Sequence, residues 1–327
     1  MMGASVLAVL ALALLIDRVV GDPPAVWARV PHPVVVFGKA IAFCDRNFNH
    51  SGAPDAIRRR NGVIAIMALL CLSLFVGGML EGIFAAFGPP GFVLEVLVVA
   101  VLLAQKSLAD HVGAVAAGLR ADGLEGGRRA VSLIVGRDPA TLDAPAICRA
   151  AIESLAENFA DGVVAPAFWY AVLGLPGILA YKMLNTADSM IGHKNEKYRD
   201  FGWASARLDD FANWPAARFS AFVIAFATLF SQGVTAAGRS LSVALRDAGL
   251  HRSPNSGWPE AAMAGALDIQ LTGPRIYGGQ RVSEPMINGA GRAVATAADI
   301  EDGVRVFYSA CHVLIGLVAL LFLIAAV

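Results

Sequence analysis

Three carboxylates stand four residues apart in a polar stretch of this chain. Glu153, Glu157 and Asp161 take positions i, i+4 and i+8 of the string E-S-L-A-E-N-F-A-D-G. At about 100° per residue they would lie within about 80° of one helix face. Such a row repels itself unless a cation lies between its members, and hard oxygen ligands suit Mg²⁺ shared with a nucleotide. The alternative is a solvated acidic face, but the apolar run that begins at Val163 favours the metal site.

Two more acidic groups follow within sixty residues of the first. One combines Asn185 and Asp188 at the end of an apolar run, where the alternative is a helix cap. The other is A-R-L-D-D-F-A-N, in which Asp209 and Asp210 follow Arg207. Adjacent aspartates can divide between a metal ligand and an ion pair with arginine. The alternative is a surface ion pair that contributes little to stability.

A fourth group precedes a predicted helix start. Arg252 is followed by S-P-N-S-G-W-P-E at 253–260, and Pro259 suits the first turn of a helix. Backbone N–H groups, two hydroxyls and a guanidinium at a helix N-terminus favour an anion-binding loop. A well-capped loop without a ligand is the alternative.

Composition places these polar groups in a membrane protein. The chain has 327 residues, of which 57% are hydrophobic and 16% charged, with a formal net charge of zero. Its mean hydropathy is +0.61. These values predict an all-α, polytopic integral membrane protein and exclude nucleic acid as a partner. The four cysteines are scattered, which argues against a disulfide framework or a zinc site.

The apolar runs predict about four to six membrane segments in one domain that covers 1–327. The segments are near 3–20, 61–87, 91–109, 163–184, 216–231 and 305–327. The polar stretches between them are long, and we expect them to be largely helical and cytoplasmic. G-P-P-G at 88–91 should make 61–109 a helical hairpin, and G-L-P-G at 174–177 should break the fourth segment.

Several strings, in order along nearly the whole chain, carry a family resemblance. They are G-D-P-P with H-P-V at 21–34, V-G-R-D-P at 135–139, E-S-L-A-E-N-F-A-D-G at 153–162, Y-K-M-L-N-T-A-D-S-M-I-G-H-K at 181–194, F-G-W-A-S-A-R-L-D-D at 201–210 and S-P-N-S-G-W-P-E at 253–260. Together they resemble the cobalamin-biosynthesis membrane synthases, the adenosylcobinamide-phosphate synthases. Phe159 and His193 depart from the family pattern, but neither is an acidic position.

The resemblance implies an ATP-dependent, acid–amine ligase in the cell inner membrane, with its active site on the cytoplasmic side. Its substrates would be adenosylcobyric acid and aminopropanol or aminopropanol phosphate, its cofactors ATP and Mg²⁺, and its surroundings the lipid bilayer and other cobalamin-pathway membrane enzymes. The corrinoid is a substrate and not a cofactor.

Chemistry then suggests roles for individual residues. We expect the catalytic residues to be Glu157, Asp188, Asp209 and Asp210. The expected Mg²⁺ ligands are Glu153, Glu157, Asp161 and Asp188. The expected substrate and phosphate ligands are Asn158, Asn185, Lys194, Arg207, Arg252, Ser253, Asn255 and Ser256.

Two other classes of function compete with this hypothesis. Carboxylates at membrane edges and a broken helix are typical of a cation-coupled transporter. A membrane signalling or scaffold protein is the third possibility. The long loops, rich in potential phosphate ligands, favour the synthase.

Overall fold

The computed structural model describes residues 2–136, 139–273, 275–277, 280–282 and 284–327. It confirms an all-α fold, since the described strands are only two or three residues long. Helices occupy most of the polar stretches as well as the apolar ones. The predicted helical character of the long loops is therefore confirmed.

The helices follow one another closely along the chain. They are α1 (Met2–Val19), α2 (Pro24–Trp27), α3 (Pro33–Phe48), α4 (Asp55–Ala86), α5 (Pro89–Leu102), α6 (Gln105–Val131), α7 (Ala144–Phe159), α8 (Ala165–Ile191), α9 (Trp203–Ser231), α10 (Val234–Asp247), α11 (Gly257–Leu267) and α12 (Ala297–Ala326). Short helical turns are η1 (Pro139–Thr141), η2 (Ala160–Val164) and η3 (Ala248–Leu250). The strands are β1 (Leu271–Thr272), β2 (Arg275–Tyr277), β3 (Gln280–Val282) and β4 (Met286–Ile287), with β1 antiparallel to β4 and β2 to β3.

Five described helical stretches are long and apolar enough to span a membrane, which indicates an integral membrane protein. They are Asp55–Ala86, Pro89–Val131, Ala144–Ile191, Trp203–Ser231 and Ala297–Ala326. Each overlaps one of the predicted segments. The remaining segment, 3–20, coincides with α1 but is not among the five.

The contacts within the chain divide it into two compact units. Unit 1 comprises Met1–Ala104, Ala165–Asn213 and Val318–Val327. Unit 2 comprises Gln105–Val164 and Trp214–Leu317. No feature of the sequence indicated this division, because neither unit is continuous in the chain.

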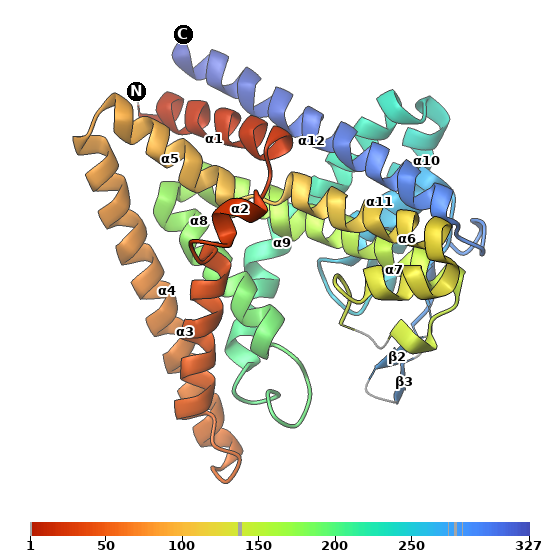
Figure 1. Cartoon of the computed structure of the whole chain (residues 1–327), viewed down its shortest axis with the longest axis horizontal. Helices are drawn as coiled ribbons and strands as arrows, with labels where there is room; N and C mark the ends of the chain where they lie inside the picture. Colours follow the sequence, from red (N-terminus) through yellow and green to blue (C-terminus); the bar gives the residue numbers. More distant parts are fainter. Residues whose placement is uncertain (1, 137–138, 274, 278–279, 283) are drawn as a thin grey trace. The chain divides into compact units, whose positions relative to one another are not determined.

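Unit 1 is built on α4 and α8, which pack along one another with α3 beside both (Figure 1). The predicted hairpin is present, since α4 and α5 are joined at Phe87–Gly88 and pack together. The predicted break in the fourth segment is a kink inside α8. Gly174 there has φ +66° and ψ −150°, a conformation that residues with a Cβ rarely adopt.

Unit 2 pairs α6 with α7 and α10 with α11, and α11 also packs against α7. Phe159, at the end of α7, makes an edge-on contact with Phe307 of α12, with ring centroids 5.6 Å apart. Ser240 of α10 donates a 2.7 Å hydrogen bond to the carbonyl of Ala262 in α11. Small residues line this contact, so the two helices approach closely.

Asp247 joins the end of α10 to the chain before α12. Its carboxylate accepts hydrogen bonds from Arg246, at 2.7 and 2.8 Å, and from the backbone N–H of Asn288, at 2.8 Å. The Arg246 guanidinium lowers the pKa of Asp247 more than burial raises it, and the Asn288 N–H lowers it further.

We therefore expect Asp247→Ala to reduce the free energy of unfolding by about 1–3 kcal/mol, because the buried Asn288 N–H loses its acceptor. The lowered pKa sets the pH dependence of the wild type. The contribution of this carboxylate is complete above its unfolded pKa of about 4 and is lost as pH falls through the lower folded pKa. Thermal unfolding in detergent at several pH values measures both effects. Asp110→Ala, which removes an exposed ion pair with Lys106, is the control, and an equal loss there would contradict the assignment.

Candidate functional site

Two members of the acidic row are held by residues from much later in unit 2. Glu153 Oε1 accepts a 2.8 Å hydrogen bond from the backbone N–H of Thr272. Glu157 Oε1 accepts a 2.8 Å hydrogen bond from the Ser256 hydroxyl. Glu153 is 3% exposed. The first carboxylates of the row are therefore not part of a solvated acidic face.

The third member, Asp161, does not continue the row as an α-helix would place it. α7 ends at Phe159, and Ala160–Val164 form the π-helical turn η2. A π turn holds more residues than an α turn, so the 100° step on which the row was predicted ends before Asp161. Such turns are frequent at functional sites, and here the turn changes the direction in which the third carboxylate is presented.

The carboxylates of the acidic row suit a Mg²⁺ ion that is also bound by substrate phosphates. No group of three or more His, Cys, Asp or Glu side chains that could hold a metal ion occurs among the described residues. Mg²⁺ is commonly bound by one or two carboxylates together with substrate phosphates, and not by an all-protein cage. Glu153 and Glu157 are two carboxylates of unit 2, and a pair of carboxylates fits that pattern. Metal binding by Glu153, Glu157, Asp161 and Asp188 stays a prediction.

The 251–256 loop is organised by its own side chains. Ser253 Oγ accepts hydrogen bonds from the backbone N–H groups of Asn255, at 3.3 Å, and Ser256, at 3.2 Å. His251 Nδ1 accepts one from the N–H of Ser253 at 3.0 Å. Three of the backbone donors expected to bind an anion are therefore used within the loop. What remains for a ligand is side-chain chemistry.

Arg252 and Asn255, two predicted phosphate ligands, have partners in unit 2. Arg252 lies 3.4 Å from the buried carboxylate of Glu284. Asn255 Oδ1 accepts a 3.3 Å hydrogen bond from Arg218, whose guanidinium lies over the rings of Trp214 and Trp258 at 4.2 and 5.1 Å. Asn158, also predicted, donates to the carbonyl of Ser154 at 2.9 Å. Sequence analysis did not select Arg218, Trp214 or Glu284.

A buried carboxylate that no motif of the sequence singled out is connected to the row through Thr272. Glu260 is 2% exposed, and its Oε2 accepts a 3.2 Å hydrogen bond from the Thr272 hydroxyl. His251 Nε2 lies 3.7 Å from Glu260 Oε1. Because His251 Nδ1 accepts a backbone N–H, the ring proton of a neutral imidazole is on Nε2, facing Glu260. Glu260 thus holds Thr272, which in turn holds Glu153.

The remaining predicted residues lie in unit 1, where α8 faces α9. Asp209 Oδ2 accepts a 2.9 Å hydrogen bond from Asn213 Nδ2, and Asn213 Oδ1 accepts one of 2.8 Å from the Tyr181 hydroxyl. Asn185 and Asp188 lie beside Asp209. The structure therefore brings together three residues that the sequence presented in two separate strings.

Asp210 has a different environment from its neighbour. The charges of Arg207 and Lys194 act on it, whereas those that act on Asp209 come from Asp188 and Asp210. Positive charge from Arg207 and Lys194 therefore acts on Asp210, whereas metal binding by either aspartate stays a prediction.

The loop that follows α8 and carries Lys194 is held in place by side chains of α3 and α4. Arg58 donates to the carbonyls of Glu196, at 3.3 Å, and Lys197. Asp45 Oδ2 accepts a 2.8 Å hydrogen bond from Lys197 Nζ. A Cβ at Gly192 would lie 1.9 Å from Asp188 Oδ1 and 2.7 Å from the Asp188 carbonyl oxygen, so the close approach of Asp188 favours glycine there. Gly192 does not have the positive φ of a left-handed cap.

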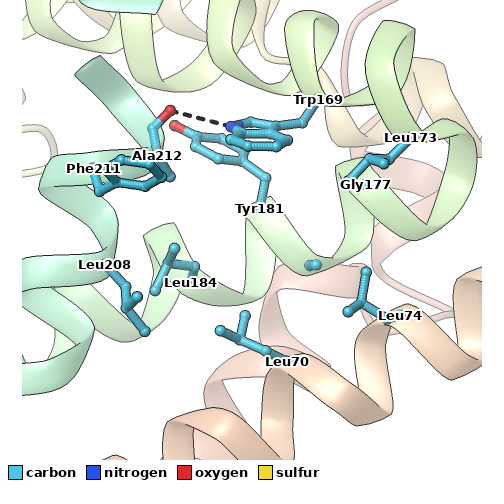
Figure 2. Close-up of a pocket in the computed structure, with 11 residues that line it drawn as sticks. Leu70, Leu74, Trp169, Leu173, Gly177, Tyr181, Leu184, Leu208, Phe211 and Ala212 are labelled. Carbon is cyan, nitrogen blue, oxygen red and sulfur yellow. Dashed lines mark hydrogen bonds between the residues drawn. The ribbon is translucent and has the colours of Figure 1, made fainter. Parts of the chain in front are cut away.

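An apolar cavity of about 240 Å³ lies beside this polar group (Figure 2). Its lining comes from α4, α8 and α9 and includes Leu70, Leu184, Leu208 and Phe211. Tyr181 lines the cavity too, while its hydroxyl bonds Asn213, so one side chain belongs to both the cavity and the acidic group. The cavity can take an apolar group, and no sequence motif indicated it.

Two carboxylates inside membrane-spanning helices also escaped sequence analysis, because each is a single charge in an apolar run. Tyr170 donates a 2.6 Å hydrogen bond to Glu95 Oε1. Glu81 Oε2 is buried and accepts no hydrogen bond from the described residues. Both carboxylates line a cavity of about 290 Å³ with Phe84 and Phe92.

Comparison with known proteins gives a consistent family. The family described as "CobD/Cbib protein" matches residues 10–307. A protein of Sinorhizobium sp named "Cobalamin biosynthesis protein CobD" is 68% identical over 317 residues, which cover 97% of this chain and 98% of the relative. Proteins of the same name from Rhizobium meliloti (96% of each chain) and Rhodobacter capsulatus (96% of this chain, 98% of the relative) are 64% and 44% identical. No solved structure matches. Arg137 and Asp138 of the V-G-R-D-P string lie outside the described residues.

We expect Asp45→Ala to free the 194–200 segment. Hydrogen bonds from Lys197 and Asn49 lower the pKa of Asp45 against the raising effect of its burial, so this carboxylate is ionised and binds Lys197 at neutral pH. Its loss should raise amide hydrogen exchange in 194–200 by about 10-fold, which corresponds to about 1.4 kcal/mol of local opening. Asp110→Ala is again the control. Unchanged exchange in 194–200 would show that Asp45 does not hold the loop.

Proposed function

Because the chain belongs to the CobD/Cbib protein family, we propose that it forms an amide bond in cobalamin biosynthesis. The acid would be the free propionate of adenosylcobyric acid, and the amine would be aminopropanol or aminopropanol phosphate. The observation that carries this proposal is the hydrogen bond from Ser256 to Glu157. It joins the acidic row to the 251–256 loop across 99 residues, so potential metal and phosphate ligands lie side by side in unit 2.

The chemistry of the reaction explains why such a site is needed. A carboxylate is a poor electrophile, and transfer of a phosphoryl or adenylyl group from ATP gives it a leaving group. Bound Mg²⁺ would neutralise charge on the transferring phosphate oxygens. The remaining tasks are to hold the nucleotide, to hold the amine and to remove its proton.

In this proposal the unit 2 residues handle the nucleotide. Glu153, Glu157 and Asp161 provide carboxylate oxygens for the metal. Phosphate oxygens would be bound by side chains of the acidic row and the 251–256 loop: Asn158, Arg252, Ser253, Asn255 and Ser256. Glu260 and Thr272 keep Glu153 in position.

For unit 1, taken by itself, we propose that its polar residues bind the amine. Lys194 and Arg207, near Asp210, supply positive charge for a substrate phosphate or carboxylate. One carboxylate of Asp209 and Asp210 would accept the proton of the amine. We further propose that the site faces the cytoplasm, where ATP is available, and that the membrane is the cell inner membrane.

The test is a ligation assay with detergent-purified full-length protein. Adenosylcobyric acid and Mg·ATP are supplied with either amine, and products are identified by mass spectrometry. We expect an amide product from the wild type and at least about a 10²-fold lower rate from Glu157→Gln, since transition-state charge stabilisation is lost. Glu125→Gln, which removes an exposed ion pair with Arg128, is the control and should keep the wild-type rate. No product from folded wild-type protein with either amine would overturn the proposal.

A cation-coupled transporter is the second candidate, because Glu81 and Glu95 line a cavity within membrane-spanning helices. Intramembrane carboxylates are expensive and commonly mark ion pathways. Thermal unfolding with and without Mg·ATP separates the two candidates. Stabilisation that disappears in Glu157→Gln favours the ligase, and its absence together with the absence of product favours the transporter.

A further inference from the structure

We propose that Asp209 and Asp188, with Asn185 beside them, bind the protonated amino group of a small primary amine. This inference rests on the proposed amide ligation and assigns the amine subsite within it. The ligand class is an alkylammonium ion with a short apolar chain. Asp209 makes the primary contact, through its Oδ1.

The geometry of α8 and α9 leaves one atom without a partner. Tyr181, Asn185 and Asp188 recur at helical spacing on α8, and Asp209 and Asn213 do so on α9. Asn213 Oδ1 accepts from Tyr181, so its Nδ2 must be the end that donates to Asp209 Oδ2. Asn185 also donates a hydrogen bond to the Asp209 carboxylate. Asp209 Oδ1 is nevertheless buried and accepts no hydrogen bond from the described residues.

Burial makes this free oxygen costly. Asp209 is 8% exposed and Asn213 is 1% exposed, so bulk water does not solvate the pair. A buried carboxylate oxygen without a partner destabilises the fold. A donor delivered by a ligand would recover that free energy.

The negative charges around Asp209 favour a cation as that ligand. The half-buried Asp188 carboxylate acts on Asp209, and two like charges close together favour a positive group between them. The positive charges of Lys194 and Arg207 act on Asp210, whereas the charges that act on Asp209 are those of Asp188 and Asp210. An ammonium group offers one positive charge and three N–H donors.

The donor set suits an ammonium ion better than Mg²⁺. Mg²⁺ requires octahedral coordination by oxygen, and the side-chain oxygen of Asn213 is already used by Tyr181. The described residues contain no group of three or more acidic or histidine side chains that could hold a metal ion. Asp188 is therefore better assigned to the amine than to the metal.

The apolar cavity of Figure 2 would hold the hydrocarbon chain of the ligand. Leu184 and Leu208, the residues just before Asn185 and Asp209, line it, and Tyr181 joins it to the acidic group. A short hydrocarbon chain attached to the ammonium group could enter it. A charged head beside an apolar lining is what a small amino alcohol requires.

The experiment compares amine binding and turnover in matched variants of the full-length protein. Binding of 1-amino-2-propanol is followed by thermal-shift titration, with 1,2-propanediol as the uncharged analogue and MgCl₂ alone as the metal probe. The variants are Asp209→Asn and the control Asp200→Asn, which removes a carboxylate paired with Arg199 in the same unit. Asp188→Asn serves if Asp209→Asn fails to fold.

We expect Asp209→Asn to weaken amine binding and to raise the amine KM by about 10- to 100-fold, with the KM for ATP unchanged, because one charge-assisted hydrogen bond is lost. Asp200→Asn should match the wild type. Equal binding of the diol, an unchanged amine KM in Asp209→Asn, no saturable amine binding to the wild type, or a magnesium response abolished by Asp209→Asn would each overturn the proposal.

The same experiment distinguishes failure of the amine subsite from failure of the proposed amide ligation. Amine binding that depends on Asp209, without any amide product, would retain the amine subsite and reject the ligation. Amide formation with an unchanged amine KM in Asp209→Asn would retain the ligation and reject the subsite.

Discussion

Each buried carboxylate of this chain needs a partner, because the apolar helices around it offer no water to replace one. Glu153 and Glu157 obtain theirs from Thr272 and Ser256, 119 and 99 residues further along the chain. The constraint therefore reaches far beyond α7. It requires the segment from η3 to β1 to fold back onto α7 within unit 2, and it fixes the direction of the carboxylates at the same time.

The long polar segments are consequently structural parts of the sites they serve. In unit 1, the loop between α8 and α9 is held by Arg58 through two backbone carbonyls and by Asp45 through Lys197. A loop anchored at its backbone keeps its shape when its side chains bind a ligand. Residues outside the polar clusters, on α3 and α4, thus determine where Lys194 is presented.

The sequence was sufficient for features that depend on neighbours in the chain. Hydropathy located the membrane helices, the turn residues located the α4–α5 hairpin, and the ordered motifs indicated the family that comparison confirmed. The sequence was insufficient where the folded structure decides the shape of a turn or the partner of a side chain. The row prediction assumed an unbroken α-helix, and η2 interrupts it before Asp161. The role of Glu260 could not be predicted, because it depends on a hydrogen bond from Thr272. Thr272 has an unusual φ of +65°, which only the folded loop imposes.

The adjacent pair Asp209 and Asp210 shows how a helix turns one dipeptide into two environments. Successive residues of an α-helix point about 100° apart, so the two carboxylates face different neighbours. Asp210 meets Arg207 and Lys194, and its charge is balanced within the chain. Asp209 meets Asp188 and two amides, and the charges that act on it are negative. The charge of Asp210 is therefore balanced within the folded chain, whereas the charge of Asp209 requires a cation from outside the chain.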